Sequence, residues 1–400
     1  MIGVATHIPM ALICPSLPFK FTPIISTLFL LFIMPKPIAI AACPYTSIFA
    51  FGDSLTDVGN RVLLYPNHSH MGEPPYGETF FHHPTGRCSD GRLIIDFIAE
   101  YYGLPFMPPS ASVMMNGGGN GSSIDGGVNF AVAGAAAVDS AFYEERGIVN
   151  VDTNCSLRVQ MRWLNQLLPI FCASPSECKE KLKSSLFVLG PFGSNDYRRA
   201  LGYGKDIEEI RSYVPLVIDV ITTAINDLIE LGATTIMVPG ILPDGCIGSV
   251  LTEFESDNKE DYDPDTGCLT WVNELSEYHN QHLQQRLNTI QHHNPDVVII
   301  YADFYNATME LYRHPEKYGF ISTLVVCCGE GGKYNLNKDV GCGDVQVKSC
   351  PEPWFYIDWD GNHMTDRANK IVSMALLDGT CTSPSINTLC DSFKKSAYYI

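Results

Sequence analysis

Five short apolar runs alternate along the chain with segments of helical periodicity. A short apolar run bounded by turn-forming residues is typical of a buried strand. The five predicted strands are Ser47–Phe51, Gly127–Gly134, Ser185–Gly190, Thr234–Val238 and Val297–Tyr301. Apolar residues at helical spacing predict a helix that begins near Leu93 and further helices over Ile210–Leu228, Leu275–Ile290 and Arg367–Leu377. Gly232 is a predicted C-cap.

This alternation predicts a three-layer α/β/α fold with a mostly parallel five-stranded sheet and helices on both faces. In such sheets, binding and catalytic groups lie at the carboxyl ends of the strands. The length of 400 residues and the apolar content of 46% suit one large domain with a sizeable core.

The first 42 residues differ in composition from the rest. They contain Lys20, Lys36, no acidic residue and the apolar run Ile24–Met34, and they end near Ala39-Ile40-Ala41, an A-x-A pattern. The pattern predicts a secretory signal peptide over residues 1–42, with Met10 as an alternative start, and a single domain over residues 43–400. A membrane anchor is the alternative, but the run has about half of the roughly 20 residues that a spanning helix needs.

The chain is acidic. Its formal net charge is −18, which becomes −20 once Lys20 and Lys36 leave with the signal peptide. Such a surface repels nucleic acid and anionic lipid, so neither is an expected partner. It permits a neutral or cationic small substrate. No C-x-x-C pair or H-E-x-x-H occurs, so no metal site is expected.

The cysteines and the N-glycosylation sequons are also typical of a secreted protein. Of 14 cysteines, 13 remain after Cys14 leaves, so disulfides and at least one free thiol are expected. Cys88 is the candidate free thiol, and the connectivity of the other cysteines stays open. Sequons predict glycosylation on surface loops at Asn67, Asn120, Asn154 and Asn306.

Candidate catalytic residues follow three of the predicted strands. Ser54 lies in the turn after the first strand, Gly134 ends the second and Asn195 follows the third. Backbone N–H groups at such turns can stabilise the oxyanion that a nucleophilic serine generates. Each residue also has an ordinary structural explanation: a helix-capping serine, a close-packing glycine and a turn asparagine.

Asp360 and His363 form a D-x-x-H pair late in the chain. With two residues between them on a turn, the carboxylate can reach back to the imidazole, although a surface turn explains most isolated pairs of this kind. No G-x-S-x-G elbow is present, which argues against the common α/β-hydrolase fold.

Together these blocks resemble the plant GDSL esterase/lipase family, within the SGNH hydrolases. The matches follow the family's order from about Tyr45 to about Leu377 and include Gly52–Asn60, Gly193–Tyr197 and Trp359–Thr365. The resemblance implies a flavodoxin-like SGNH fold and a carboxylic ester hydrolase without a metal or organic cofactor.

The resemblance also implies a role for each candidate residue. Ser54 would be the nucleophile, His363 the general base and Asp360 the group that orients the imidazole. The N–H groups of Ser54 and Gly134 and the amide of Asn195 would hold the oxyanion. Asp57 is expected to fix the turn after the serine rather than to act as a base.

The chain departs from the family pattern near the expected pocket. The departures are Gly190-Pro191-Phe192 before Asn195, Leu242-Pro243-Asp244 near the acyl pocket, and Asn362 and Met364 beside the histidine. We expect the first to alter the pocket wall, and Asn362 and Met364 to change the shape around the catalytic histidine. Cys327–Asn335 resembles a family signature and is expected to be a disulfide-stapled loop beside the site.

Three stretches, Pro74–Phe80, Thr85–Ala99 and Asn129–Ala135, resemble acetylajmalan esterase-like members. They favour a secreted, monomeric esterase of the apoplast or vacuole that hydrolyses a small acetyl, methyl or similar ester of a plant specialised metabolite, such as an alkaloid. One alternative is an acyltransferase that uses the same acyl-enzyme with an alcohol acceptor. The other is an inactive secreted binding protein, which predicts damage among the catalytic residues, yet all of them are present.

Overall fold

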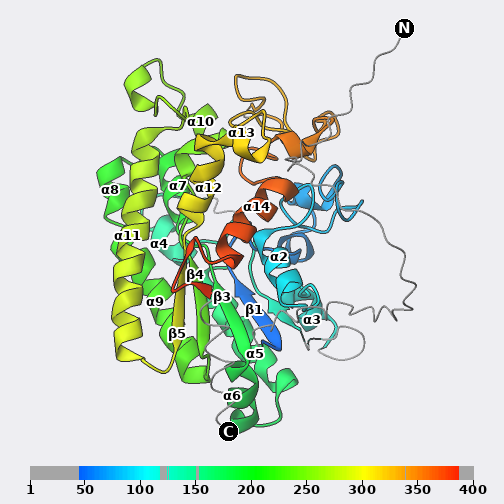
Figure 1. Ribbon diagram of the computed structural model, residues 1–400, viewed down its shortest axis with the longest axis vertical. Helices are drawn as coiled ribbons and strands as arrows, with labels where there is room; N and C mark the ends of the chain where they lie inside the picture. Colours follow the sequence, from blue (N-terminus) through cyan, green and yellow to red (C-terminus); the bar gives the residue numbers. More distant parts are fainter. Residues whose placement is uncertain (1–44, 118–123, 125, 150–152, 338, 387–400) are drawn as a thin grey trace, which may run out of the picture. The chain divides into compact units, whose positions relative to one another are not determined.

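The computed structural model describes residues 45–117, 124, 126–149, 153–337 and 339–386. The predicted signal peptide and Asn120 lie outside these ranges. A six-stranded sheet with the order β2-β1-β3-β4-β5-β6 forms the centre (Figure 1). Its strands are β1 (Ser47–Phe51), β2 (Gly127–Asn129), β3 (Ser185–Leu189), β4 (Thr235–Pro239), β5 (Val298–Ala302) and β6 (Thr382–Ser383).

The first five strands pair in parallel, in agreement with the predicted sheet. The prediction missed β6, which pairs antiparallel with β5 at the edge. A two-residue strand is too short to give a periodic pattern, so only its pairing reveals it.

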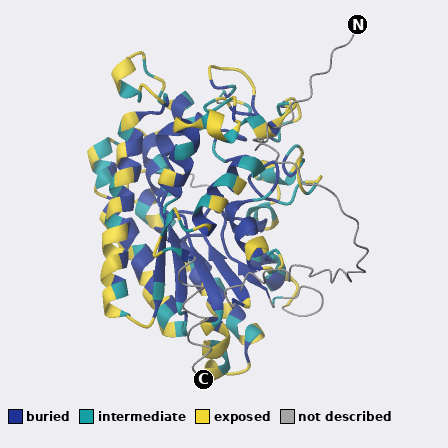
Figure 2. Ribbon diagram, in the orientation of Figure 1, coloured by how far each residue is buried: buried dark blue, intermediate teal, exposed yellow. Residues whose placement is uncertain are grey.

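Successive residues of β1 face opposite sides of the sheet, and each side has its own core. Phe49 and Phe51 pack on one side, whereas Ile48 and Ala50 pack on the other. The first side is covered by α5 (Leu157–Phe171), α9 (Val214–Leu231) and α11 (Thr270–His293). The second is covered by α2 (Ile94–Tyr101), α12 (Phe304–Arg313) and α14 (Asp366–Leu377). Because both faces are covered, β1 to β4 are buried throughout and β5 is buried from Ile299 onward (Figure 2), which confirms the three-layer α/β/α fold.

Shorter helices fill the connections. The α-helices are α1 (Asn60–Leu64), α3 (Ser110–Met115), α4 (Ser140–Glu144), α6 (Pro175–Lys183), α7 (Ser194–Gly202), α8 (Ile207–Arg211), α10 (Gly248–Glu253) and α13 (Pro315–Tyr318). The 3-10 turns are His70–Gly72, Asp244–Cys246, Lys259–Asp261 and Pro353–Phe355.

The periodic segment predicted from Ile210 divides into two helices. Ile210 belongs to α8, and α9 begins at Val214 with Pro215 in its first turn. Proline suits a first turn because its missing N–H would have had no partner there. Gly232 caps α9 with a φ of +112°, so the predicted C-cap is confirmed.

Four disulfides lie among the described residues: Cys172–Cys178, Cys246–Cys268, Cys327–Cys350 and Cys328–Cys342. Cys88 is a free thiol as predicted, and Cys155 and Cys381 are further free thiols. Within the described part of the chain, no helix is long and apolar enough to cross a membrane.

Three of the four sequon asparagines lie within the described ranges. Asn67, Asn154 and Asn306 are all exposed. The expectation of surface loops is wrong for Asn306, which lies in the first turns of α12 and donates its side-chain amide to Asp303. Glycosylation at these positions stays a prediction.

Candidate active site

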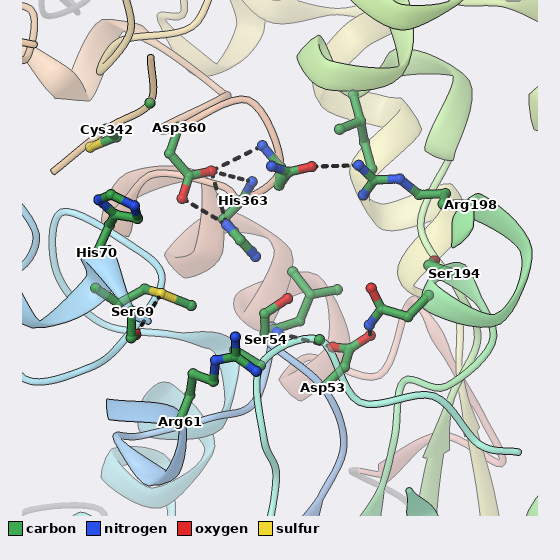
Figure 3. Close-up of a pocket in the computed structure, with 18 of the residues that line it drawn as sticks. Asp53, Ser54, Arg61, Ser69, His70, Ser194, Arg198, Cys342, Asp360 and His363 are labelled. Carbon is green, nitrogen blue, oxygen red and sulfur yellow. Dashed lines mark hydrogen bonds and ion pairs between the residues drawn. The ribbon is translucent and has the colours of Figure 1, made fainter. Parts of the chain in front are cut away.

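A cavity of about 540 Å³ opens at the carboxyl edge of the sheet. Its lining includes all five predicted catalytic and oxyanion residues, which come from four separate segments: Ser54, Gly134, Asn195, Asp360 and His363. Figure 3 shows the imidazole of His363 directed into the cavity on the side where Ser54 lies. The fold therefore brings together residues that are far apart in the sequence.

Ser54 lies in a turn directly after β1. Gly52 makes this turn possible, since it has a φ of +155° and a Cβ there would lie 2.8 Å from the carbonyl oxygen of Gly190. Helix α1 begins only at Asn60, with Gly59 as its N-cap. The structural alternative of a helix-capping serine is therefore wrong.

Asp57 holds the turn in place, as predicted. Its carboxylate accepts hydrogen bonds from the backbone N–H groups of Gly59, Asn60, Arg61 and Ala133 at 2.6–2.9 Å. Burial nevertheless raises its pKa to about 6. Because Ala133 precedes Gly134, this one carboxylate ties the serine turn to the second predicted oxyanion segment.

Further buried amides fix the same region. The side chain of Asn60 donates to the carbonyls of Asn129 and Ala131, both at 2.9 Å. Gln160 forms two hydrogen bonds with the backbone of Gly52, at 3.0 and 2.8 Å. Gly134 follows with a φ of +81°, a conformation that favours glycine.

Asn195 lies at the start of α7, with its amide toward the cavity. Its Nδ2 donates to the carbonyl of Ala135 at 2.9 Å and, more weakly, to Oδ2 of Asp53 at 3.3 Å. Asp53 is 2% exposed, and burial raises its pKa to about 7. Asn195 is thus oriented by groups next to Ser54 and next to Gly134.

Asp360 and His363 form the hydrogen-bonded pair that the D-x-x-H spacing predicts. Nδ1 of His363 lies 2.9 and 2.8 Å from the two carboxylate oxygens. The backbone N–H groups of Asn362 and His363 donate to Oδ1 of the same carboxylate. Burial alone would lower the pKa of His363, but the adjacent charge of Asp360 raises that pKa well above its usual value. Burial would likewise raise the pKa of Asp360, but the charge of His363 lowers it.

Comparison with known proteins identifies the family. The description GDSL-like Lipase/Acylhydrolase matches residues 48–376. This chain belongs to that family. An Arabidopsis thaliana GDSL esterase/lipase is 47% identical over 86% of this chain and 85% of its own length. A second one from the same plant is 46% identical over 86% and 87%. The sinapine esterase of Brassica napus is 44% identical over 91% and 94%.

Membership of the GDSL family confirms the family resemblance and the SGNH fold. It also shows that the chain is a carboxylic ester hydrolase acting on small-molecule substrates. The relatives do not single out acetylajmalan esterase-like members.

Two side chains that hold the histidine turn of this GDSL esterase were missed from the sequence. The hydroxyl of Tyr76 donates to Oδ2 of Asp360 at 2.8 Å. The buried thiol of Cys88 lies against the imidazole of His363, and burial raises the pKa of that thiol. Both residues lie in stretches that resemble the family, but nothing in their spacing indicates a contact across more than 270 residues.

Some of the departures from the family pattern line the cavity, and others do not. Asp244 and Asn362 line the cavity, as does Leu242. Pro191 and Phe192 do not line it, because Phe192 is 1% exposed and packs in the core beneath. The expected change of the pocket wall at Pro191 and Phe192 is therefore wrong for this cavity. Met364 is 5% exposed and packs into the opposite core, where it lines a small hollow together with Asn362 and His363, so it does shape the surroundings of the histidine.

The disulfide-stapled loop lies beside the site as expected. Cys342, paired with Cys328, contributes to the cavity lining together with Gly341. The adjoining rim comes from residues 68–71 and Tyr76, where Nδ1 of His70 lies 3.4 Å from a carboxylate oxygen of Asp344. No group of three or more His, Cys, Asp or Glu side chains arranged to hold a metal ion occurs among the described residues.

Proposed function

We propose that this esterase hydrolyses a small ester of a plant specialised metabolite through a covalent acyl group on Ser54. The observation that supports the proposal is the shared cavity, in which Ser54, the Asp360–His363 pair and the Gly134 and Asn195 segments meet. A serine, an oriented imidazole and preorganised donors are the parts that acyl transfer requires.

In the proposed mechanism, Oγ of Ser54 attacks the ester carbonyl while Nε2 of His363 takes the hydroxyl proton. The tetrahedral intermediate then collapses, the alcohol leaves and His363 returns the proton to it. Water attacks the acyl-serine in the same way and releases the carboxylic acid and free Ser54. Asp360 keeps Nδ1 of His363 hydrogen-bonded, so that Nε2 is the atom that accepts the proton.

The oxyanion would be held by three donors. Among the hydrogen bonds of the described residues, none uses the backbone N–H of Ser54 or Gly134, so both are available. The amide of Asn195 would exchange its long contact with Asp53 for the oxyanion and keep its bond to Ala135. One such donor contributes about 2.7–4 kcal/mol to the transition state.

The substrate proposal rests on the size of the site and on the relatives. A cavity of about 540 Å³ suits an ester of small-molecule size. One relative carries the name sinapine esterase, after a plant metabolite. We propose an acetyl, methyl or similar small acyl or alkyl group on such a metabolite, an alkaloid being one candidate. The disulfides support secretion, and we propose a monomer that works in the apoplast or vacuole.

A fluorophosphonate probe tests the nucleophile. We expect mass spectrometry to find the label on Ser54 and no label in Ser54→Ala, while Ser69→Ala, which removes another serine of the same cavity, keeps it. A panel of metabolite esters with acyl chains of increasing length then tests the substrate class. Folded protein without a label would contradict the mechanism, and a preference for long-chain lipid esters would contradict the substrate class.

A further inference from the structure

We propose that Arg198 is a substrate-recognition residue. It binds an oxygen acceptor on the ester, and this acceptor lies about one helical turn away from the reacting carbonyl. The acceptor is a carbonyl, hydroxyl or carboxylate oxygen on either half of the ester. The inference rests on the proposed function, because it takes the position of the reacting carbonyl from Ser54 and Asn195.

The first argument for this role is the position of Arg198 on α7. Residues three apart on a helix lie on the same face, so Asn195 and Arg198 both point into the cavity that they line. At a rise of about 1.5 Å per residue, the two side chains leave the helix about 4.5 Å apart along its axis. A group held by Arg198 is therefore a few bonds away from a carbonyl held by Asn195.

The guanidinium is held from one side and leaves donors for a ligand. Nη2 of Arg198 donates to Oδ1 of Asn362 at 2.5 Å and to Oγ of Ser249 at 2.6 Å. Figure 3 shows this link reaching from α7 to the histidine turn. Among the described residues, the hydrogen bonds of Arg198 all come from Nη2. Nε and Nη1 are thus left to donate to a substrate.

Among the described residues, no carboxylate forms an ion pair with Arg198, although its positive charge partly offsets the effect of burial on the pKa of Asp244. Asp244 is 3% exposed and accepts a hydrogen bond from Ser194 at 3.1 Å rather than from Arg198. Guanidinium groups that line a cavity without an ion-pair partner suit oxygen acceptors, and carboxylates best, because the fork of N–H donors matches two oxygens.

Asn362 explains how this chain orients the fork. Its side-chain oxygen accepts the hydrogen bond from Arg198, which a valine side chain at this position could not do. Here the backbone N–H of Asn362 also donates to Asp360 at 2.9 Å, so the residue joins Arg198 to the catalytic turn. A guanidinium fixed in this way loses little side-chain entropy when it binds a substrate.

Matched esters test the inference. In the acyl arm, kcat/KM is compared for methyl butanoate, monomethyl succinate and dimethyl succinate. In the alcohol arm, it is compared for butyl acetate and 4-acetoxybutanoate. We expect at least one arm to show a preference of tenfold or more for the esters with the additional oxygen acceptor, and that arm identifies the half of the ester that Arg198 binds.

The variants separate recognition from a structural role. In Arg198→Gln, we expect the preference to fall at least tenfold, mainly through KM, whereas Arg162→Gln, at an exposed arginine of α5, leaves it unchanged. Asn362→Val is expected to weaken the preference less than Arg198→Gln does. Fluorophosphonate labelling of Ser54 is measured on every variant, so a failure of the proposed nucleophile is distinguished from a failure of this inference.

Three results would overturn the inference while Ser54 still labels. The wild-type enzyme could show no preference, either because it uses the matched esters equally or because it uses none of them. Arg198→Gln could keep the preference. Arg198→Gln could also lower kcat/KM by the same factor for every ester and lose thermal stability, which is the result expected of a purely structural arginine.

Discussion

The serine turn and the histidine turn face each other across one cavity but are held in different ways. At the serine turn, the buried side chains of Asp57, Asn60 and Gln160 bind the backbone of the sheet's carboxyl edge. The histidine turn lies in a loop before α14, and the side chains of Tyr76, Cys88 and Arg198 reach it from distant segments.

This difference predicts which substitutions damage the fold and which damage activity. Backbone hydrogen bonds to buried side chains fix the nucleophile with little freedom, because an unpartnered buried donor is costly. The histidine turn also has buried carboxylates that accept hydrogen bonds from its backbone N–H groups, but side chains from distant segments add to them, and one departure of this chain, Asn362, lies in the turn itself. We therefore expect changes at the serine turn to damage the fold, and changes at the histidine turn to damage activity first.

The largest expected effect is at the histidine turn. Asp360→Asn removes the charge that orients and stabilises the imidazolium, and it should lower kcat by about 10⁴-fold. Since Asp360 raises the pKa of His363, its neutralisation should also move the acid limb of the pH–rate profile to lower pH. Rate profiles and thermal unfolding check this, and a large loss of stability in Asp360→Asn would contradict the comparison.

The corresponding change at the serine turn is Asp57→Ala. It leaves four backbone N–H groups without their acceptor, so we expect a loss of about 3 kcal/mol in the free energy of unfolding. Asp296→Ala, at an exposed aspartate, should change little. Chemical denaturation measures both. An Asp57→Ala variant of normal stability with low kcat would show that the two turns do not differ as we infer.

Tyr76→Phe sharpens the comparison with a smaller change. It removes one hydrogen bond to an ionised carboxylate and should lower kcat about tenfold with little effect on KM or stability. Tyr102→Phe is the matched control, because the buried hydroxyl of Tyr102 has no hydrogen-bond partner among the described residues. Equal effects of the two substitutions on kcat would remove Tyr76 from the positioning of Asp360.

The smallest effect concerns a property that both turns share. Burial raises the pKa of Asp53 to about 7 and of Asp57 to about 6 at the serine turn, of Asp358 to about 7 beside the histidine turn, and of Asp244 to about 6 in the 3-10 turn after β4. The folded state binds these protons more tightly than the unfolded state, so their contribution to stability is present at acid pH and is lost as the pH rises from about 4 to 7.

We therefore expect the melting temperature to be higher at pH 5 than at pH 7.5, by at least about 4 °C. Differential scanning calorimetry at constant ionic strength measures the difference. Asp244→Asn should reduce it, and a melting temperature that is equal or higher at pH 7.5 would show that these carboxyls do not control the pH dependence.

Much of the fold could be predicted because it depends on local pattern. The runs that became β1, β3, β4 and β5 are almost entirely apolar, as is typical of parallel strands covered on both faces. Ser54, Gly134 and Asn195 were expected together because the carboxyl ends of parallel strands share one edge. Asp360 and His363 were expected to pair because their spacing alone lets the side chains meet.

The sequence by itself thus determined the sheet, the edge that carries the site and the residues that belong to it. Tertiary structure alone decided which cysteines pair, that Thr382–Ser383 joins the sheet, and that Tyr76 and Arg198 meet the histidine turn. These contacts join loops that are separated by up to 284 residues. Periodicity records only which face of its own element a residue occupies, whereas contacts between loops depend on how the whole chain is folded.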